Sequence, residues 1–402
     1  MTDLRPLVDF VEEAEDEEGI EPIPLEDIRE AVVYSSDWTT ETILAQLRRQ
    51  NIQINPSFQR RDAWTRRRKS RFVESLILGL PVPQIVLAER REQKGQYIVL
   101  DGKQRLLTLL QFTGSAPESR FNSFALQGLD VRGDLNGAGF DDLSQDLILG
   151  SDYDALMNQT VRAVVIRNWP SLDFLHLVFV RLNSEHVSLS PQELRQALFP
   201  GPFVEFVDSR AADSDPLRIL LKLTEPDFRM RDVEIVVRFL GFSYFLPEYT
   251  GNLKRFLDTT CERLNRLWHD REEDIRDRID ALDGAMTATI AIFGEDGAAR
   301  KWVGDRFEGR LNRAILDVMA FYLAEPRIRE AALGARAEVK AAFQELCLDE
   351  DFRSAIETTT KSMGATRTRF LRWGQALRET VALDFRVPYE GDDERVFEGF
   401  WR

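Results

Sequence analysis

The chain is poor in cysteine and histidine, with two cysteines and three histidines among 402 residues. Two cysteines, Cys261 and Cys347, exclude a disulfide-stabilised scaffold and a four-cysteine zinc site. No apolar run reaches the roughly 18 residues of a membrane span. The chain also opens on an acidic segment, Met1–Asp3, and not on the basic and then apolar start of a signal peptide. We therefore expect a cytoplasmic protein without a membrane partner, and its length is typical of two domains.

Positive charge is outnumbered, with 53 Lys and Arg against 68 Asp and Glu and a formal net charge of −15. Residues 1–30 contain twelve acids and two bases and so carry −10, which leaves −5 for the other 372 residues. This segment is too acidic and too poor in apolar residues to fold alone, and we interpret it as a tail. It serves either to solubilise the protein or to compete with phosphates for a basic groove.

A basic block follows soon after the acidic segment. Between Leu47 and Phe72, nine bases stand against one acid, Asp62, and give a net charge of +8. Eight of the nine are Arg, whose planar guanidinium suits phosphate. Several lie at the start of a predicted helix, where positive charge opposes the helix dipole. We infer that these bases serve a phosphate-bearing partner or an acidic neighbour.

Apolar periodicity predicts an α+β protein. We predict an acidic tail over 1–30, a first domain over 31–202 and a mostly α-helical domain over 203–402. The first domain combines predicted strands over 51–55, 84–88, 97–100 and 161–166 with helices over 40–49, 66–78, 103–112 and 172–182, and with an irregular insertion over 115–160. The second domain carries predicted helices over 231–245, 253–266, 274–292, 310–324 and 327–346.

Three segments carry residues suited to chemistry. The first is a loop, Phe58–Gln59–Arg60, with Trp64 close behind it. In the second, a predicted strand ends in Asp101–Gly102 and a helix follows, so that backbone N–H groups and the helix dipole can hold an anion. The third runs from Asn183 to Leu194 and includes a capping box, Ser190 to Glu193. Each segment alone is also explained by ordinary structure, as a stacked core contact, a common turn or a helix start.

Taken together and in this order, the segments resemble the ParB/sulfiredoxin-like domain of GmrSD-type modification-dependent restriction enzymes and related phage-defence proteins. That domain forms the N-terminal part of those proteins. The resemblance includes Ser75–Pro83 and Asp101–Leu106, and it covers about residues 35–265. One position departs from the family pattern, because Lys103 stands where the family commonly has Gln. A lysine there can still face a phosphate, but it is less suited to align a water molecule.

The resemblance implies a small mixed-sheet domain that binds a nucleotide, and several family members hydrolyse nucleoside triphosphates. The expected cofactors are a nucleoside triphosphate, with its base left open, and Mg²⁺. By this resemblance the residues expected to bind the cofactor are Gln59, Arg60, Gly102, Lys103 and Asn183. The residues expected to act in catalysis are Asp101, Gln104 and Arg105, and Asp101 is also the expected metal ligand.

Many family members also carry a C-terminal nuclease domain of the HNH kind, which needs a His general base beside metal ligands. No histidine follows His269 in this chain, so we expect no HNH domain. Glu338–Val339–Lys340 has a spacing used by other nucleases, but it falls in a predicted helix without a nearby upstream Asp partner. Sulfiredoxin chemistry needs a Cys in the turn at residues 101–105, and this turn has none.

Two functional hypotheses remain open. In the first, the protein is a nucleotide-hydrolysing component of a prokaryotic restriction or anti-phage defence system, and its helical half contacts DNA, a separately encoded effector or another copy of itself. In the second, it is a non-enzymatic sensor of a nucleotide or of modified DNA that regulates a separate effector nuclease. A direct nuclease is a third alternative.

Overall fold

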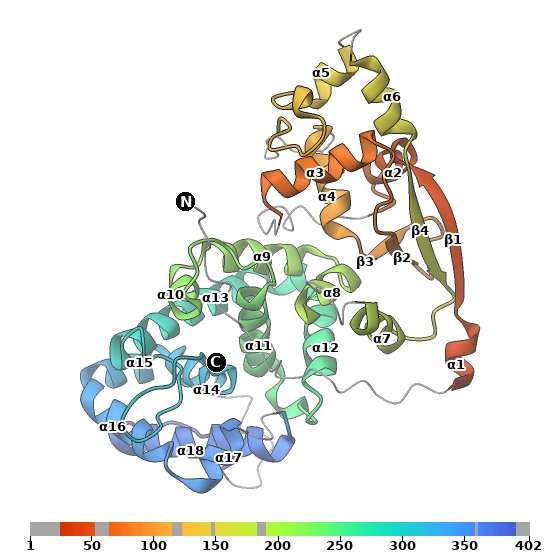
Figure 1. The fold of residues 1–402 in the computed structure, drawn as a ribbon. Coiled ribbons are helices and arrows are strands. Elements are labelled where there is room, and N and C mark those ends of the chain that lie inside the picture. The colour runs from red at the N-terminus through yellow and green to blue at the C-terminus, as the bar shows by residue number, and fades with distance from the viewer. Residues whose placement is uncertain are drawn as a thin grey trace.

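Four strands form one mixed sheet in the first part of the chain (Figure 1). The computed structural model describes residues 25–52, 64–114, 123–145, 149–182, 190–357 and 361–390. The strands, in the order β1-β4-β2-β3 across the sheet, are β1 (Val32–Thr39), β4 (Thr160–Arg167), β2 (Ile85–Glu89) and β3 (Tyr97–Asp101). β2 and β3 form an antiparallel hairpin, whereas β4 runs parallel to β2 and antiparallel to β1. The mixed sheet confirms the predicted fold class.

Two helical layers cover the sheet, because successive residues of a strand point to opposite faces. Ile85 and Leu87 of β2 join a core with α2, α3, α4 and α6, and Val86 and Ala88 join a second core with α7 and α8. The helices of this part are α1 (Leu25–Glu30), α2 (Thr40–Arg48), α3 (Arg66–Ile77), α4 (Lys103–Phe112), α5 (Phe140–Gln145), α6 (Gly150–Asn158), α7 (Leu172–Leu182) and α8 (Pro191–Leu198), with a 3-10 turn at η2 (Gly133–Leu135).

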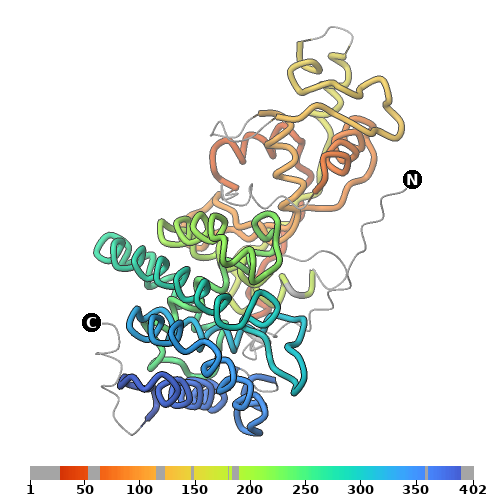
Figure 2. The backbone as a smooth tube through the Cα atoms, turned by 90° about the vertical axis from the view of Figure 1, so that its left-hand side faces the viewer, coloured from red at the N-terminus to blue at the C-terminus, as the bar shows by residue number. Residues whose placement is uncertain are grey.

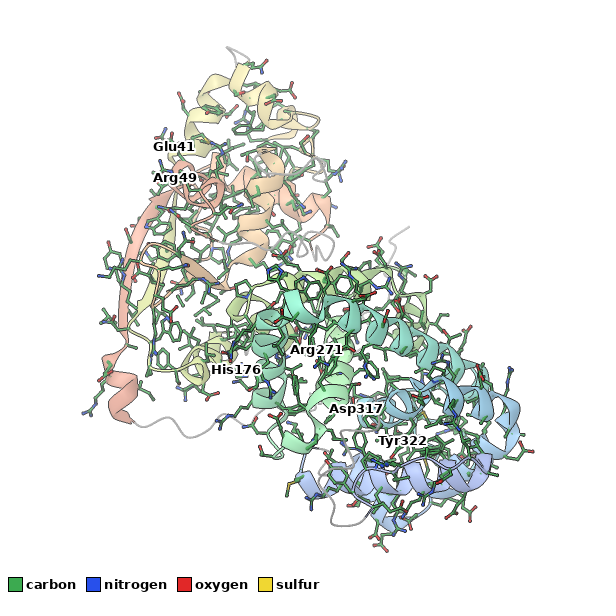
Figure 3. All side chains as sticks on the ribbon, turned by 180° about the vertical axis from the view of Figure 1, so that it is seen from behind. Glu41, Arg49, His176, Arg271, Asp317 and Tyr322 are labelled. Carbon is green, nitrogen blue, oxygen red and sulfur yellow. The ribbon has the colours of Figure 1, made fainter. Side chains whose placement is uncertain are left out.

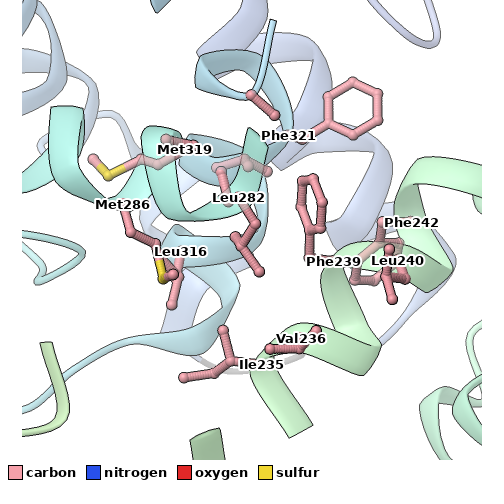
Figure 4. Close-up of a cluster of buried hydrophobic side chains, with 14 of the residues drawn as sticks. Ile235, Val236, Phe239, Leu240, Phe242, Leu282, Met286, Leu316, Met319 and Phe321 are labelled. Carbon is pink, nitrogen blue, oxygen red and sulfur yellow. The ribbon is translucent and has the colours of Figure 1, made fainter. Parts of the chain in front are cut away.

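The second part of the chain is helical and packs around its own apolar core, which runs from Phe203 to Leu377 (Figure 4). Its elements are α9 (Pro202–Asp213), α10 (Asp215–Leu221), α11 (Arg231–Phe245), η3 (Leu246–Glu248), α12 (Leu253–Arg266), α13 (Trp268–Phe293), α14 (Arg313–Leu323), α15 (Pro326–Gly334), α16 (Arg336–Leu346), α17 (Glu350–Glu357) and α18 (Met363–Val381). α11 is buried nearly all round, and its charged residues Asp232, Glu234 and Arg238 are buried together with its apolar ones. Among the described residues, no helix is long and apolar enough to cross a membrane.

The two parts are stacked end to end, as the tube in Figure 2 shows. α8 lies at their junction, where it contacts β3 on one side and α11 on the other (Figure 1). The largest core begins at Phe203, close to the predicted division at residue 202. The domain boundaries themselves stay a prediction.

Most predicted elements are confirmed, and the bounds of α4, α7, α11 and α12 agree with the predicted ranges. The insertion over 115–160 is wrong in part, because α5 and α6 lie within it and close one face of the core. The sequence does not predict β1, because the strand shows no alternation of apolar and polar residues. Its first four residues are all exposed. The predicted helix over 327–346 is two helices that meet at Ala335, whose non-helical φ of −123° and ψ of 42° end α15. Of the predicted strand over 51–55, Ile52 forms a bridge with Tyr97 and residues 53–55 lie outside the described residues.

Candidate functional site

The turn between β3 and α4 requires glycine at position 102. Gly102 is the N-cap of α4 and has φ +95° and ψ 8°, a left-handed conformation that side-chain-bearing residues avoid. An added Cβ would also lie 2.7 Å from Cγ2 of Ile85 on the neighbouring strand. The backbone of β3 therefore turns into α4 directly against β2.

The N-terminus of α4 has no side-chain cap from a described residue. The first helical hydrogen bond joins the N–H of Leu106 to the carbonyl of Gly102 at 3.0 Å, so the N–H groups of the preceding turn have no intrahelical acceptor. These N–H groups and the positive end of the helix dipole together attract anions. The strand, turn and helix lie as the sequence predicts, and binding of an anion at this turn stays a prediction.

Arg105 folds back over this turn. Its Nη2 donates to Oδ2 of Asp101 at 2.9 Å and to the carbonyl of Gln84 at 2.7 Å. The Arg105 side chain is only 13% exposed, and its Nε has no hydrogen-bond partner among the described residues. Oε1 of Gln104 is likewise buried without a partner in the described part of the chain. Two buried polar atoms of the first turn of α4 thus have no hydrogen-bond partner within the described part of the chain.

Lys103 points its ammonium group toward α8. Its Nζ lies 2.5 Å from Oε1 of Glu193, and the two side chains are 6% and 5% exposed. The other oxygen of Glu193 accepts the backbone N–H of Ser190 at 2.7 Å, which completes the predicted capping box of α8. From the sequence, Lys103 is expected to be a cofactor-binding residue, whereas Glu193 is given only the role of capping a helix. The third motif has two carboxylates, Glu185 and Glu193, so the sequence offers Glu193 as one of two possible partners of Lys103.

The remaining sequence-predicted site residues lie outside the described residues, namely Gln59, Arg60 and Asn183. Within the described residues, the structure brings together Asp101, Gly102, Lys103, Gln104 and Arg105 at one turn. No three His, Cys, Asp or Glu side chains among the described residues converge as a metal site. Asp101, the residue expected to hold Mg²⁺, accepts a hydrogen bond from Arg105.

A second cluster of charges lies beside α8, at the junction with the helical part. Arg195 of α8 donates to Asp258 of α12 at 2.8 Å, and Lys254 of α12 reaches both Asp258 and Asp173 of α7. The imidazole of His176, which is 4% exposed, lies beside this cluster (Figure 3). Burial, together with the positive charge of Lys254, lowers the pKa of His176 to about 4. His176 is therefore neutral at physiological pH.

Arginines at the start of α3 form an exposed basic face, defined here as Arg66, Arg67, Arg68 and Arg71. Asp130 is the acidic neighbour of two of them, with Arg71 at 2.5 Å and Arg67 at 3.9 Å. Arg68 stacks over Trp64, with its Cζ 4.7 Å from the ring centroid. Asp130 and Glu74, whose carboxylate feels the charge of Arg71, are the acids described beside these four guanidinium groups, and the α3 basic face remains positive.

Glu74 holds the loop that carries Asp130. Its carboxylate accepts the backbone N–H groups of Asp130, Val131 and Arg132 at 3.1, 2.8 and 2.7 Å. Burial acts to raise the pKa of Glu74, but these three donors outweigh it and the pKa lies below its usual value. The ionised carboxylate thus fixes the loop against α3.

The match with a family model covers this architecture. Residues 41–200 match the model described as GmrSD restriction endonuclease, N-terminal domain. These residues form a GmrSD-type N-terminal domain. The matched range contains three of the four strands, the β3–α4 turn and Glu193, and it confirms the resemblance seen in the motifs. The comparisons with curated proteins and with solved structures give no match.

The GmrSD-type domain indicates a restriction or phage-defence protein. The domain match names no ligand, and the helical part from Pro202 onward lies beyond the matched residues.

Proposed function

We propose that this protein binds a nucleoside triphosphate at the N-terminus of α4 and hydrolyses it in a restriction or phage-defence reaction on DNA. The observation that carries the proposal is the pair of buried polar atoms, Gln104 Oε1 and Arg105 Nε, that lack a partner among the described residues beside an uncapped helix start. Buried polar atoms in folded proteins nearly always have hydrogen-bond partners. A nucleotide supplies both kinds of partner, since its phosphate oxygens accept and its hydroxyl groups donate.

Each residue of the turn has a role in this proposal. Gly102 lets the backbone approach the phosphate, and the first N–H groups of α4 bind it. Arg105 adds a charged donor whose direction is set by Asp101 and by the carbonyl of Gln84. Asp101 orients the attacking water or a magnesium ion, and Gln104 bonds the ligand through Oε1. The motif pattern implies that Gln59, Arg60 and Asn183 also bind this nucleotide.

The α3 basic face is the part of this domain that suits DNA. Its guanidinium groups are complementary in charge to phosphodiesters, and a phosphate contact needs no base recognition. Such contacts support the action on DNA that the GmrSD-type domain suggests. Asp130 competes with phosphate for Arg67 and Arg71 and so limits non-specific attraction.

The experiment is a titration of the full chain with each of the four ribonucleoside triphosphates and Mg²⁺, followed by a phosphate-release assay. Arg105→Ala should weaken binding tenfold or more, since a hydrogen bond to a charged group contributes about 1.5–3 kcal/mol. Asp101→Ala should slow phosphate release. Arg372→Ala is the matched control, because it breaks an exposed ion pair with Asp351 in the helical part. Equal affinity and equal phosphate release in all four proteins would refute the proposal.

A second candidate is a sensor that binds the nucleotide without turnover and signals to a separate effector nuclease. The observation that favours it is that Asp101 is engaged by Arg105 and Lys103 by Glu193. A carboxylate oxygen that already accepts a hydrogen bond from an arginine has less acceptor capacity left to orient a water molecule. Saturable binding without phosphate release, in the presence of Mg²⁺ and DNA, would select the sensor over the hydrolase.

A further inference from the structure

The ion pair between Lys103 and Glu193 joins the candidate nucleotide site to a different helix. Lys103 is the first residue of α4, and its backbone belongs to the turn proposed to bind phosphate. Its ammonium group reaches Oε1 of Glu193 in the interior of the protein. Separating two buried charges leaves each without compensation, so α4 and α8 are held together firmly.

Both carboxylate oxygens of Glu193 are in use, and they serve different elements. Oε1 accepts from Lys103 of α4, whereas Oε2 accepts from the N–H of Ser190 and caps α8 itself. The hydroxyl of Ser190 accepts the N–H of Glu193 and donates to the carbonyl of Arg229 at 2.6 Å, just before α11. A displacement of Lys103 therefore changes the cap of α8 and, through Ser190, the segment that leads into α11.

Arg195, two residues after Glu193 in α8, makes a second connection to the helical part. Arg195 is buried and donates through Nε to Asp258 of α12 at 2.8 Å, while its Nη1 bonds Gln192 within α8. Asp258 also accepts from Lys254, which holds Asp173 of α7. α8 is thus bonded to α4 on one side and to α11 and α12 on the other, through polar groups in a densely packed interior.

We propose that Glu193 is a positioning residue of the α4 site and that α8 transmits the occupancy of this site to α11 and α12. This inference rests on the proposed function, since it requires a ligand at α4. A bound triphosphate brings several negative charges to the start of α4, where they compete with Glu193 for the ammonium of Lys103. Weakening of the Lys103–Glu193 contact shifts α8, and the bonds of Ser190 and Arg195 carry the shift into the helical part.

The test compares amide hydrogen exchange with and without each ribonucleoside triphosphate and Mg²⁺, in the wild type and in the double variant Lys103→Gln, Glu193→Gln. The double variant replaces two buried charges by two amides that can still hydrogen bond. In the wild type, nucleotide should slow exchange in α4, where it binds, and speed exchange in α8, in residues 229–235 and in α12, because the Lys103–Glu193 contact that holds α8 weakens. In the double variant, nucleotide should bind more weakly, because Lys103 belongs to the proposed phosphate site; at saturating nucleotide it should still slow exchange in α4, but the effect on residues 229–235 and α12 should be lost.

A matched control neutralises another ion pair of the same domain. The double variant Arg132→Gln, Asp152→Asn removes a pair that joins a loop to α6. Within the described part of the chain this pair has no hydrogen bond to α8, so the variant should keep the full nucleotide response of α11 and α12. If the Lys103–Glu193 double variant does not fold, Lys103→Gln alone retains the Glu193 carboxylate and an amide donor, and it should reduce that response by at least half.

The outcomes separate the two proposals. Slower exchange in α4 alone in the wild type, or an unchanged response of α11 and α12 in the Lys103–Glu193 variants, would overturn the role of α8 and leave nucleotide binding intact. No effect of any nucleotide on α4 in the wild type would overturn the proposed function and, with it, this inference.

Discussion

The guanidinium of Arg105 and the carboxylate of Asp101 meet at 2.9 Å across the turn that joins β3 to α4. Both residues belong to the motif that the sequence singles out, and the contact gives that motif a definite geometry. It places an arginine, a carboxylate and a helix N-terminus within one turn. Asp101 therefore has two roles. Its carboxylate orients Arg105, and in the proposed reaction it also orients water or binds magnesium.

Replacement of Gly102 by Ala should destabilise the protein by about 2 kcal/mol or more, because an L-residue with positive φ is strained and the new Cβ meets Ile85. Gly95→Ala is the matched control. It also has a positive φ, of +81°, but its Cβ would meet nothing within 4 Å, so about 1 kcal/mol is expected. Urea unfolding followed by circular dichroism measures both. An equal loss of unfolding free energy in the two variants would show that the contact of the new Cβ with Ile85 does not destabilise the fold.

Replacement of Glu74 by Gln should lower stability at pH 7 by about 1–3 kcal/mol, because three backbone N–H groups lose their charged acceptor. The folded pKa of Glu74 lies below its unfolded value, so its contribution is present above the unfolded pKa and is lost as the pH falls through the folded pKa. The difference between the wild type and Glu74→Gln should therefore shrink in acid. Exposed Glu330→Gln serves as the control and should change stability by less than about 0.5 kcal/mol at either pH. A Glu74→Gln difference that is the same at pH 7 and pH 3 would contradict this account.

His176 should make the fold less stable as the pH falls from about 6.5 to about 4. Its pKa is lowered to about 4 in the folded chain, so in this range the unfolded chain binds a proton that the folded chain does not. The loss amounts to about 3 kcal/mol at most. His176→Gln should remove this pH dependence, whereas His269→Gln, on an exposed position of α13, should keep it. Parallel stability–pH curves for the two variants would count against a buried neutral His176.

Arg66→Ala and Arg68→Ala should each weaken DNA binding. Each should also reduce the slope of log affinity against log salt concentration by about 1, which corresponds to the loss of one phosphate contact. Asp130→Asn should act in the opposite direction, because it removes the carboxylate that holds Arg67 and Arg71. Fluorescence anisotropy with a labelled duplex at several salt concentrations measures these effects, with Arg372→Ala as the control. If Asp130→Asn weakened DNA binding, the α3 basic face would not be the DNA surface.

Local patterns account for the elements that could be predicted. The capping side chains of Thr65 and Ser190 occur at the expected helix starts, and Gly102 begins α4 at the expected turn. The β2–β3 hairpin follows from two apolar runs around a polar turn. β1 could not be predicted in this way, because it is an edge strand held by pairing with β4. α5 and α6 were also missed, since their short polar sequences become helical by packing against the first core.

The sequence by itself determined the helix starts, the hairpin, the turn at Gly102 and the set of motifs that identifies the GmrSD-type domain. All of these depend on residues that are neighbours along the chain. Only the tertiary structure decided which charges meet. Lys103 pairs with Glu193 across 90 residues, and Arg71 pairs with Asp130 across 59. A sequence pattern does not show which residues far apart along the chain lie close in space. The packing of the folded chain brings these pairs together.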